Sequence, residues 1–452
     1  MTSKTLNHYA SKSLGKRLLF GGLWAGFFKV VAGVFGLLVN VILVKVLSPG
    51  EMGSFFLTHS MVTVFSLVAQ LGLPQLIVRL TAEGLATENM TRVKSDICLA
   101  LIIACITCLI TSSCVVLFAG DWVAIHVFNS PLITTAIGIA SFWIVALTLQ
   151  VIFVEVFRGL HDVKIASLFG GALTNFLLFV IVCLFWLYGD ADYYTVVQIS
   201  AGSAFFSMAI AGYILFRRLV GLKNEKLQFG TGQFLSDVWP LWVTTLTLYV
   251  LVQADLWVVA YFLDNSSVAL YGAAARLIMM LALLVSLTYA VLPPIVAELN
   301  KKGDYQQLQR VLRAFAFGNT LLVAPVFIGI LLFPSSVLHI LFGEFYADAG
   351  PVLVALAIGK LVNICTGMRG YILMLTGHGQ LLMKVTIFGG ILNIIFCIVG
   401  VIHFGILGVA IGAASASILQ CIFEMVAVRR QMGLWTHLSF IEFKGLVNEY
   451  KG

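Results

Sequence analysis

The chain has 452 residues, of which 60% are hydrophobic and only 10% charged, with a formal net charge of +7 and a mean hydropathy of +1.03. Soluble domains carry about 25% charged residues, so this composition excludes a water-soluble globule and predicts an all-α polytopic membrane protein. The eight cysteines lie in apolar segments and the eight histidines form no cluster, so we expect neither a disulfide framework nor a metal site.

Twelve apolar segments are long enough to cross a bilayer, which needs about 20 residues per helix. In chain order they lie near residues 19–46, 53–78, 97–119, 132–157, 166–187, 195–215, 240–262, 268–295, 312–333, 350–374, 381–402 and 405–427. The first of them is interrupted by Lys29. We therefore expect about 12 transmembrane helices.

Basic residues are distributed unevenly among the connections between these segments. Of the 27 lysines and arginines, 22 lie in the N-terminal segment, in every second loop or in the tail. The loops between them contain acids such as Asp121, Asp190 and Glu344 and no basic residue. By the positive-inside rule both termini are cytoplasmic. The net charge follows from this topology, so no nucleic-acid partner is expected.

One constant offset in residue number relates the two halves of the chain. The landmarks that recur at this offset are Gly53 as Gly272, Pro74 as Pro293, and Phe169-Gly170-Gly171 as Phe388-Gly389-Gly390. Six spans per half is an even number, so both halves enter the membrane in the same direction, as in parallel-repeat transporters. The offset thus predicts a duplicated six-helix unit.

The repeat divides the chain into four parts. We expect an N-terminal six-helix lobe over residues 1–215, a cytoplasmic linker over 216–238, a C-terminal six-helix lobe over 239–428 and a cytoplasmic amphipathic tail over 429–452. In the tail, apolar residues such as Trp435 and Phe440 alternate with polar ones, which favours an interfacial segment. No loop outside the membrane is long enough to fold alone, which disfavours an enzyme.

Five basic residues fall outside the loop pattern: Lys29, Lys45, Arg276, Lys360 and Arg369. Charges inside a span tend to face a cavity and mark a substrate path, although Lys45 is close enough to a span end to snorkel. Lys29 shares one helical face with small or polar residues, namely Gly22, Gly26, Gly33, Gly36 and Asn40. Such a stripe also suits close helix packing, but a dry interface would strand the lysine charge, so we favour a cavity.

The remaining three cations lie in the second half. Arg276 either lines a cavity or pairs with Asp255, and Lys360 shares a face with Asn363. Arg369 lies nearly opposite Lys360 on a straight helix. Both could line one cavity only if the helix breaks at Gly367 or Gly370, and we expect Arg369 to reach the cytoplasmic interface instead.

Three acids also fall within spans. Glu155 is one turn from Arg158, which favours a local ion pair. Asp255 lies deeper and is the better candidate for a proton or cation coupling group, whereas Glu424 is expected at the interface. An interior with more cations than acids suits an anionic ligand such as a lipid pyrophosphate.

Two short motifs in each half resemble a known family. They are Leu47-Ser48-Pro49-Gly50-Glu51-Met52-Gly53 followed by Gly72-Leu73-Pro74, and Asp255-Leu256-Trp257 followed by Tyr271-Gly272-Ala273-Ala274-Ala275-Arg276. In order and spacing the chain resembles the polysaccharide (O-antigen type) flippases of the multidrug/oligosaccharidyl-lipid/polysaccharide (MOP) superfamily. The resemblance implies two six-helix lobes in a V-shaped arrangement around a central cleft, like the multidrug exporters of that superfamily (MATE).

The resemblance also implies a function, which is to carry a polyprenyl-pyrophosphate-linked oligosaccharide across a bacterial inner membrane by alternating access. Its partners would be membrane lipids and, at the level of the pathway, a glycan polymerase and a chain-length protein. We expect Lys29, Arg276 and Lys360, with Asn40 and Asn363, to hold the pyrophosphate. Asp255 and Glu155 are the candidates for H⁺ or Na⁺ coupling, and no other cofactor is expected. The candidates for helix bending are Gly33, Gly36, Pro74 and Pro293.

Two other functions stay open. The first is a cation-coupled multidrug exporter on the same fold, although such exporters typically carry acids in the N-terminal lobe, where this chain has Lys29. The second is a membrane enzyme that polymerises or ligates glycans, which would form product in detergent. A flippase, in contrast, needs a sealed membrane.

Overall fold

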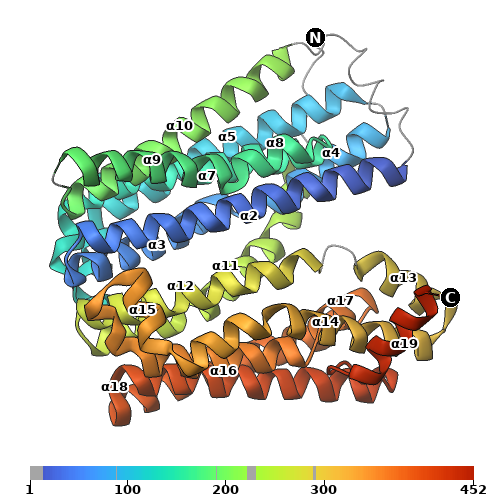
Figure 1. Ribbon diagram of the computed structural model, residues 1–452. Helices are drawn as coiled ribbons and strands as arrows, with labels where there is room; N and C mark the ends of the chain where they lie inside the picture. The colour runs from blue at the N-terminus through green and yellow to red at the C-terminus, as the bar shows by residue number, and fades with distance from the viewer. Residues whose placement is uncertain (1–13, 88, 190, 221–230, 289–291, 452) are drawn as a thin grey trace. The chain divides into compact units, whose positions relative to one another are not determined.

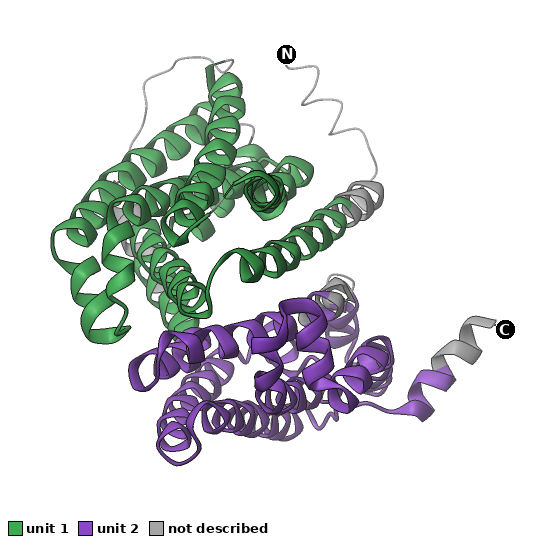
Figure 2. Ribbon diagram, turned by 60° about the vertical axis from the view of Figure 1, so that its left-hand side comes forward, with its two compact units in different colours: residues 1–250 green, residues 251–452 purple. Residues whose placement is uncertain are grey.

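The computed structural model describes residues 14–451 except 88, 190, 221–230 and 289–291. It is helical throughout the described residues (Figure 1). The chain divides into two compact units, Met1–Val250 and Leu251–Gly452, which Figure 2 colours green and purple. The all-α polytopic fold predicted from the sequence is confirmed.

The first unit contains the helices up to the middle of α11. These are α2 (Leu14–Val46), α3 (Pro49–Gln70), α4 (Leu73–Ala86), α5 (Met90–Cys114), α6 (Gly120–Trp122), α7 (Ile137–Gly159), α8 (Val163–Ser167), α9 (Leu173–Tyr188), α10 (Tyr193–Val220) and α11 (Thr231–Phe262). Short π or 3₁₀ segments link some of them: η1 (Val115–Ala119), η2 (Val123–Val127), η3 (Pro131–Ala136) and η4 (Leu168–Ala172). Of the predicted linker 216–238, residues 221–230 lie outside the described residues and the rest belongs to α10 and α11.

The second unit continues from the C-terminal part of α11. Its helices are α12 (Asn265–Thr288), α13 (Leu292–Lys302), α14 (Tyr305–Leu332), α15 (Pro334–Phe342), the 3₁₀ segment η5 (Glu344–Ala349), α16 (Gly350–Cys365), α17 (Arg369–Leu375), α18 (Gly379–Met432) and α19 (Phe440–Lys451) (Figure 1). Its buried core includes Leu308 of α14, Ile372 of α17, Val428 of α18 and Leu434, which follows α18.

Ten described helical stretches are long and apolar enough to cross a membrane. One of them, α18, has 54 residues and contains the last two predicted spans. The two spans are separated within α18 by Gly405, which has non-helical backbone angles (φ 58°, ψ −140°). The two arms of α18 pack together, since the Cys397 thiol contacts the carbonyl oxygen of Val409 at 3.6 Å. The 24-residue α12 occupies the place of the eighth predicted span. The direction in which the helices cross, with cytoplasmic termini, stays a prediction.

The second predicted span is two helices rather than one. Helix α3 ends at Gln70, and the next two residues, Leu71 (φ 47°) and Gly72 (φ 73°), have left-handed backbones. Helix α4 then starts at Leu73 with Pro74 in its first turn. A proline is tolerated there because a first-turn N–H has no acceptor within the helix.

In the second unit, the proline that recurs at the offset found in the sequence also lies near the start of a described helix. Helix α12 ends at Thr288, and α13 begins at Leu292 with Pro293 as its second residue. Leu292 follows Leu73 at the same offset by which Pro293 follows Pro74. The prediction of an unbroken span over 53–78 was wrong, whereas residues 289–291, within the predicted span 268–295, lie outside the described residues.

The motif at residues 47–53 has a structural role at the start of α3. The Ser48 hydroxyl accepts a hydrogen bond from the Glu51 N–H at 3.4 Å, and a carboxylate oxygen of Glu51 accepts one from the Ser48 N–H at 2.9 Å. This reciprocal pair is a capping box, which satisfies two backbone donors that a helix start leaves without partners.

Candidate functional site

Lys29 lies on α2 inside an apolar span and its side chain is exposed. Among the described residues its ammonium group has no hydrogen bond or ion pair. The stripe that Lys29 shares is packed further along: a Cβ on Gly36 would lie 3.2 Å from Asn175 of α9, and Asn40 donates a hydrogen bond to the Gly36 carbonyl at 2.6 Å. The stripe is therefore a helix contact at Gly36 and open at Lys29.

Lys360 and Asn363 lie one turn apart on α16, and both are half-buried. The Asn363 amide donates to the Cys421 sulfur of α18 at 3.6 Å. The Lys360 ammonium is close enough to Cys421 and Arg369 to interact electrostatically, but it has no hydrogen bond or ion pair within the described part of the chain. It is a half-buried cation in a span, and no acid faces it there.

Arg369 is placed differently from the sequence prediction. Helix α16 ends at Cys365, Gly367 adopts φ +76°, and α17 starts at Arg369, so the tenth predicted span is broken. The break turns the Arg369 side chain back into the unit, where only 4% of the residue is exposed. The expectation that Arg369 reaches an interface was wrong, because the helix does not continue straight through Gly367.

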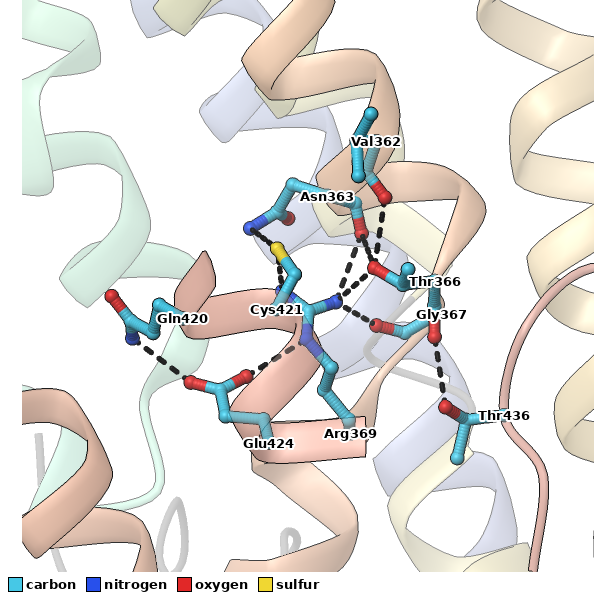
Figure 3. Close-up of polar contacts among 9 residues, drawn as sticks. All are labelled: Val362, Asn363, Thr366, Gly367, Arg369, Gln420, Cys421, Glu424 and Thr436. Carbon is cyan, nitrogen blue, oxygen red and sulfur yellow. Dashed lines mark hydrogen bonds and ion pairs between the residues drawn. The ribbon is translucent and has the colours of Figure 1, made fainter. Parts of the chain in front are cut away.

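The Arg369 guanidinium is surrounded by acceptors (Figure 3). Its Nε lies 2.9 Å from a carboxylate oxygen of Glu424, which is itself 6% exposed. One terminal nitrogen donates to the carbonyls of Asn363 and Gly367 at 3.1 and 3.0 Å and to the Thr366 hydroxyl at 2.5 Å. Glu424 is thus buried rather than interfacial, and Arg369 caps the C-terminal end of α16, where a cation also complements the helix dipole.

The ion pair with Glu424 distinguishes the charge of Arg369 from that of Lys360. The other Glu424 oxygen accepts from the Gln420 amide at 2.9 Å, so both carboxylate oxygens are occupied (Figure 3). The charge of Arg369 is balanced inside the unit, whereas that of Lys360 is not. Of these two neighbouring cations, Lys360 is the one available to an anionic ligand.

Asp255 lies in the part of α11 that belongs to the second unit, where it contacts Tyr271 of α12. The buried Tyr271 hydroxyl donates to one Asp255 oxygen at 2.6 Å, and the Leu256 N–H donates to the other at 2.8 Å. Arg276 lies part-buried on the same helix as Tyr271. Asp255 therefore accepts one hydrogen bond on each oxygen, from donors that carry no charge.

Glu155 forms the local ion pair expected for it. Both of its oxygens lie within 2.7 Å of the Arg158 guanidinium, one turn away on α7. The backbone does not test the residues predicted to bend helices. Gly33 lies within α2, and Pro74 and Pro293 are the second residues of α4 and α13. The described residues contain no group of three or more potential metal ligands, and their cysteines are free.

The family of the chain follows from comparison with known proteins. Residues 18–300 match the model of the family described as polysaccharide biosynthesis protein, which is more than half of the chain. The chain belongs to this family.

Two relatives of this polysaccharide biosynthesis protein are informative. The probable low-salt glycan biosynthesis flippase Agl15 of Haloferax volcanii is 28% identical over 172 residues, which are 38% of this chain and 36% of Agl15. The chain thus matches only about a third of that relative. An uncharacterized membrane protein of Methanocaldococcus jannaschii, MJ1068, is 22% identical over 417 residues, 87% of this chain and 80% of MJ1068.

Comparison with solved structures shows the fold of this chain. An inward-facing MATE-family multidrug resistance transporter of the MOP superfamily superposes with a TM-score of 0.71 at 16% identity, covering 89% of this chain and 94% of that one. The lipid II flippase MurJ in an inward closed conformation gives 0.69 at 16% identity, covering 93% and 88%. The chain therefore has the fold that these two transporters share. A bacterial inner membrane stays a prediction.

Proposed function

We propose that this polysaccharide biosynthesis protein moves a polyprenyl-pyrophosphate-linked oligosaccharide, of the O-antigen type or a related surface glycan, from one leaflet of its membrane to the other by alternating access. Family membership and the name of the Agl15 relative support a lipid-linked glycan as substrate. The observation that carries the proposal is the unbalanced charge of Lys360, half-buried in α16.

The argument rests on the cost of such a charge. An ionisable group in a span costs about 2.5–3.5 kcal/mol even on insertion scales, and its retention requires a compensating interaction. Glu424 does not supply it, because both of its oxygens are engaged by Arg369 and Gln420. A pyrophosphate would supply it, since phosphate oxygens form strong charge-assisted hydrogen bonds with ammonium groups. Lys29 is a second candidate of the same kind in the first unit.

The coupling part of the proposal rests on Asp255. We assign it the binding of H⁺ or Na⁺, because it is an acid inside a candidate membrane span and the uncharged groups that donate to it, Tyr271 and Leu256, do not cancel its charge. Transport that is unaffected both by Asp255→Asn and by collapse of the ion gradients would remove this part and leave the substrate proposal in place.

The test is a sidedness assay in sealed proteoliposomes. A polyprenyl-pyrophosphate oligosaccharide starts in the inner leaflet, and an impermeant glycosidase outside reports its arrival. We compare wild type with Lys29→Gln and Lys360→Gln, and with Lys384→Gln as a control that removes an exposed lysine near the start of α18. Loss of about tenfold or more in rate for Lys360→Gln, with Lys384→Gln unchanged, is expected if one phosphate contact is removed.

The other outcomes decide between the alternatives. Protein-dependent arrival that both lysine variants retain would keep the function and assign these lysines structural roles. No arrival under any ion gradient, together with efflux of a cationic dye, would indicate the multidrug exporter. Product that forms from the oligosaccharide in detergent would indicate the enzyme.

A further inference from the structure

The residues that follow α18, together with the first turn of α19, are packed into the second unit. We call residues 433–443 the tail segment. Leu434 is 3% exposed and belongs to the same core as Ile372 of α17 and Val428 of α18. Thr436 is fully buried. The apolar side chains that suggest an interfacial segment in the sequence therefore include one that is part of the protein core.

The tail segment caps the broken end of α16. The Thr436 hydroxyl donates to the carbonyl of Thr366 at 2.9 Å, and the Leu438 N–H donates to the carbonyl of Cys365 at 2.9 Å. Carbonyls at a helix C-terminus have no donor within the helix and need one from outside it. From the inner side, Arg369 donates to two neighbouring carbonyls of the same helix end. Figure 3 shows Thr436 and Arg369 on either side of the Thr366–Gly367 turn.

A second set of contacts fastens the tail segment to α14. The Arg313 guanidinium reaches the carbonyl of His437 at 3.4 Å and a carboxylate oxygen of Glu442 at 3.7 Å. The ring of Phe443 lies 5.1 Å from that of Phe317. These groups are partly exposed, so each contact is individually weak.

We propose that the tail segment is a strap, which holds the α16–α17 break closed over the Arg369–Glu424 pair and which releases as a unit. Segments with few buried apolar contacts open at a lower free energy than the core they cover. Leu434 is the main buried apolar anchor, and the other contacts are hydrogen bonds, long ion pairs and the ring contacts of Phe440 and Phe443 with Phe317. Release leaves two α16 carbonyls without donors and admits water to Arg369, whose charge water can solvate.

Gly367 provides a way to displace the strap. A Cβ at this position would lie 2.5 Å from the carbonyl oxygen of Thr436 and 3.2 Å from Cβ of Ala316. Because both neighbours are backbone or stiff atoms, Gly367→Ala and the docked strap exclude each other. Gly377 is the matched control, since its φ of +85° carries the same strain for alanine as the +76° of Gly367, while nothing lies within 4 Å of its Cβ position.

Two native cysteines report on the opening. Cys421 is fully buried and its sulfur accepts from Arg369, the residue over which the strap closes, at 2.6 Å. Cys397 is also fully buried in α18 but contacts Asn393 and Val409 instead. In the full-length protein we would keep one of the two and replace the other seven cysteines by alanine. The rate of N-ethylmaleimide labelling then measures the opening at each site. Because this measurement needs no substrate, it tests the strap independently of the proposed function.

The expected result is selective exposure of Cys421. Its labelling should rise about tenfold or more in Gly367→Ala and about fivefold in Thr436→Val, which loses one hydrogen bond without adding volume. It should stay at the parent rate in Gly377→Ala, and Cys397 should stay protected in all three. If Gly367→Ala does not fold, Thr436→Val decides. Protection of Cys421 in the variants that fold, or labelling of Cys397 that rises in parallel, would overturn the strap.

Discussion

Removing the charge of Glu424 is the sharpest test of the buried ion pair. Arg369 and Glu424 are 4% and 6% exposed and their charged atoms lie 2.9 Å apart, so neither charge is solvated when its partner is lost. Breaking a buried pair by removing one partner costs about 3–5 kcal/mol. We expect Glu424→Gln to fall at the lower end, about 3 kcal/mol, because Arg369 keeps its four other acceptors.

Arg369→Gln should cost more than Glu424→Gln. It leaves Glu424 with Gln420 alone, and it also removes the donors to the carbonyls at the end of α16, which adds about 1–3 kcal/mol. The assay is unfolding in mixed detergent micelles titrated with a denaturing detergent, with the exposed Arg430→Gln as control.

The double variant separates pairing from simple loss of structure. Residues in direct contact show coupling energies of about 0.5–3 kcal/mol, so Arg369→Gln combined with Glu424→Gln should be less destabilised than the sum of the single variants. The reasoning fails if Glu424→Gln unfolds at the wild-type midpoint, or if the two single effects simply add.

Two further predictions concern the arms of α18 and the tail. A Cβ on Gly408 would run into the backbone of Gly400, so Gly408→Ala should cost about 3 kcal/mol or more, whereas Gly202→Ala, with open space, should leave the unfolding midpoint within about 0.5 kcal/mol; equal effects would contradict the close packing. Burial and the neighbouring Arg313 cation lower the pKa of His437 below 6.5, so the docked tail favours neutral imidazole and its stability falls as pH drops from 6.5 toward that lower pKa. Thermal melts between pH 7.5 and 5.5 should show a smaller loss in His437→Gln than in wild type, and equal losses would exclude this histidine as the cause.

The membrane fold could be predicted from the sequence because its cause is local. A span is a run of apolar residues long enough to cross the bilayer, and nothing distant in the chain changes that requirement. The break between α3 and α4 was also signalled, by Pro74 in an apolar run. The sequence could not show that Pro74 lies at the start of a new helix, because a proline in an apolar run is compatible with both a kink and a helix start.

The polar interior of the second unit could not be predicted in the same way. Arg369 and Glu424 belong to different predicted spans, and their meeting depends on a break at Gly367, one of 41 glycines. The sequence showed that Arg369 could turn inward only if the helix breaks at Gly367 or Gly370. It did not show that the helix is broken, because the broken end is capped by Thr436 and Leu438, which lie far away in the chain. An amphipathic tail has the same pattern whether its apolar side faces lipid or protein.

The repeat relates Arg369 to a buried polar residue of the first unit. The offset that relates Pro293 to Pro74 also relates Arg369 to Gln150 of the first unit, and Gln150 is buried too, at 5% exposure. The Gln150 amide donates to the carbonyl of Phe169 at 2.7 Å, next to the break at Gly171 (φ +119°), as Arg369 donates to the carbonyls at its own break. One position of the duplicated unit thus places a buried donor against a broken helix in both halves.

The two halves differ in the charge of that donor. A neutral amide needs only acceptors, and Gln150 finds them in Thr174 and Ser207 as well as Phe169. A guanidinium also needs a counter-charge, and in the second unit Glu424 provides it. Because Glu424 is thereby fully engaged, it leaves Lys360 without an acid. Under the proposed function, the arginine at the repeat position is therefore what keeps the nearby lysine available to an anionic substrate.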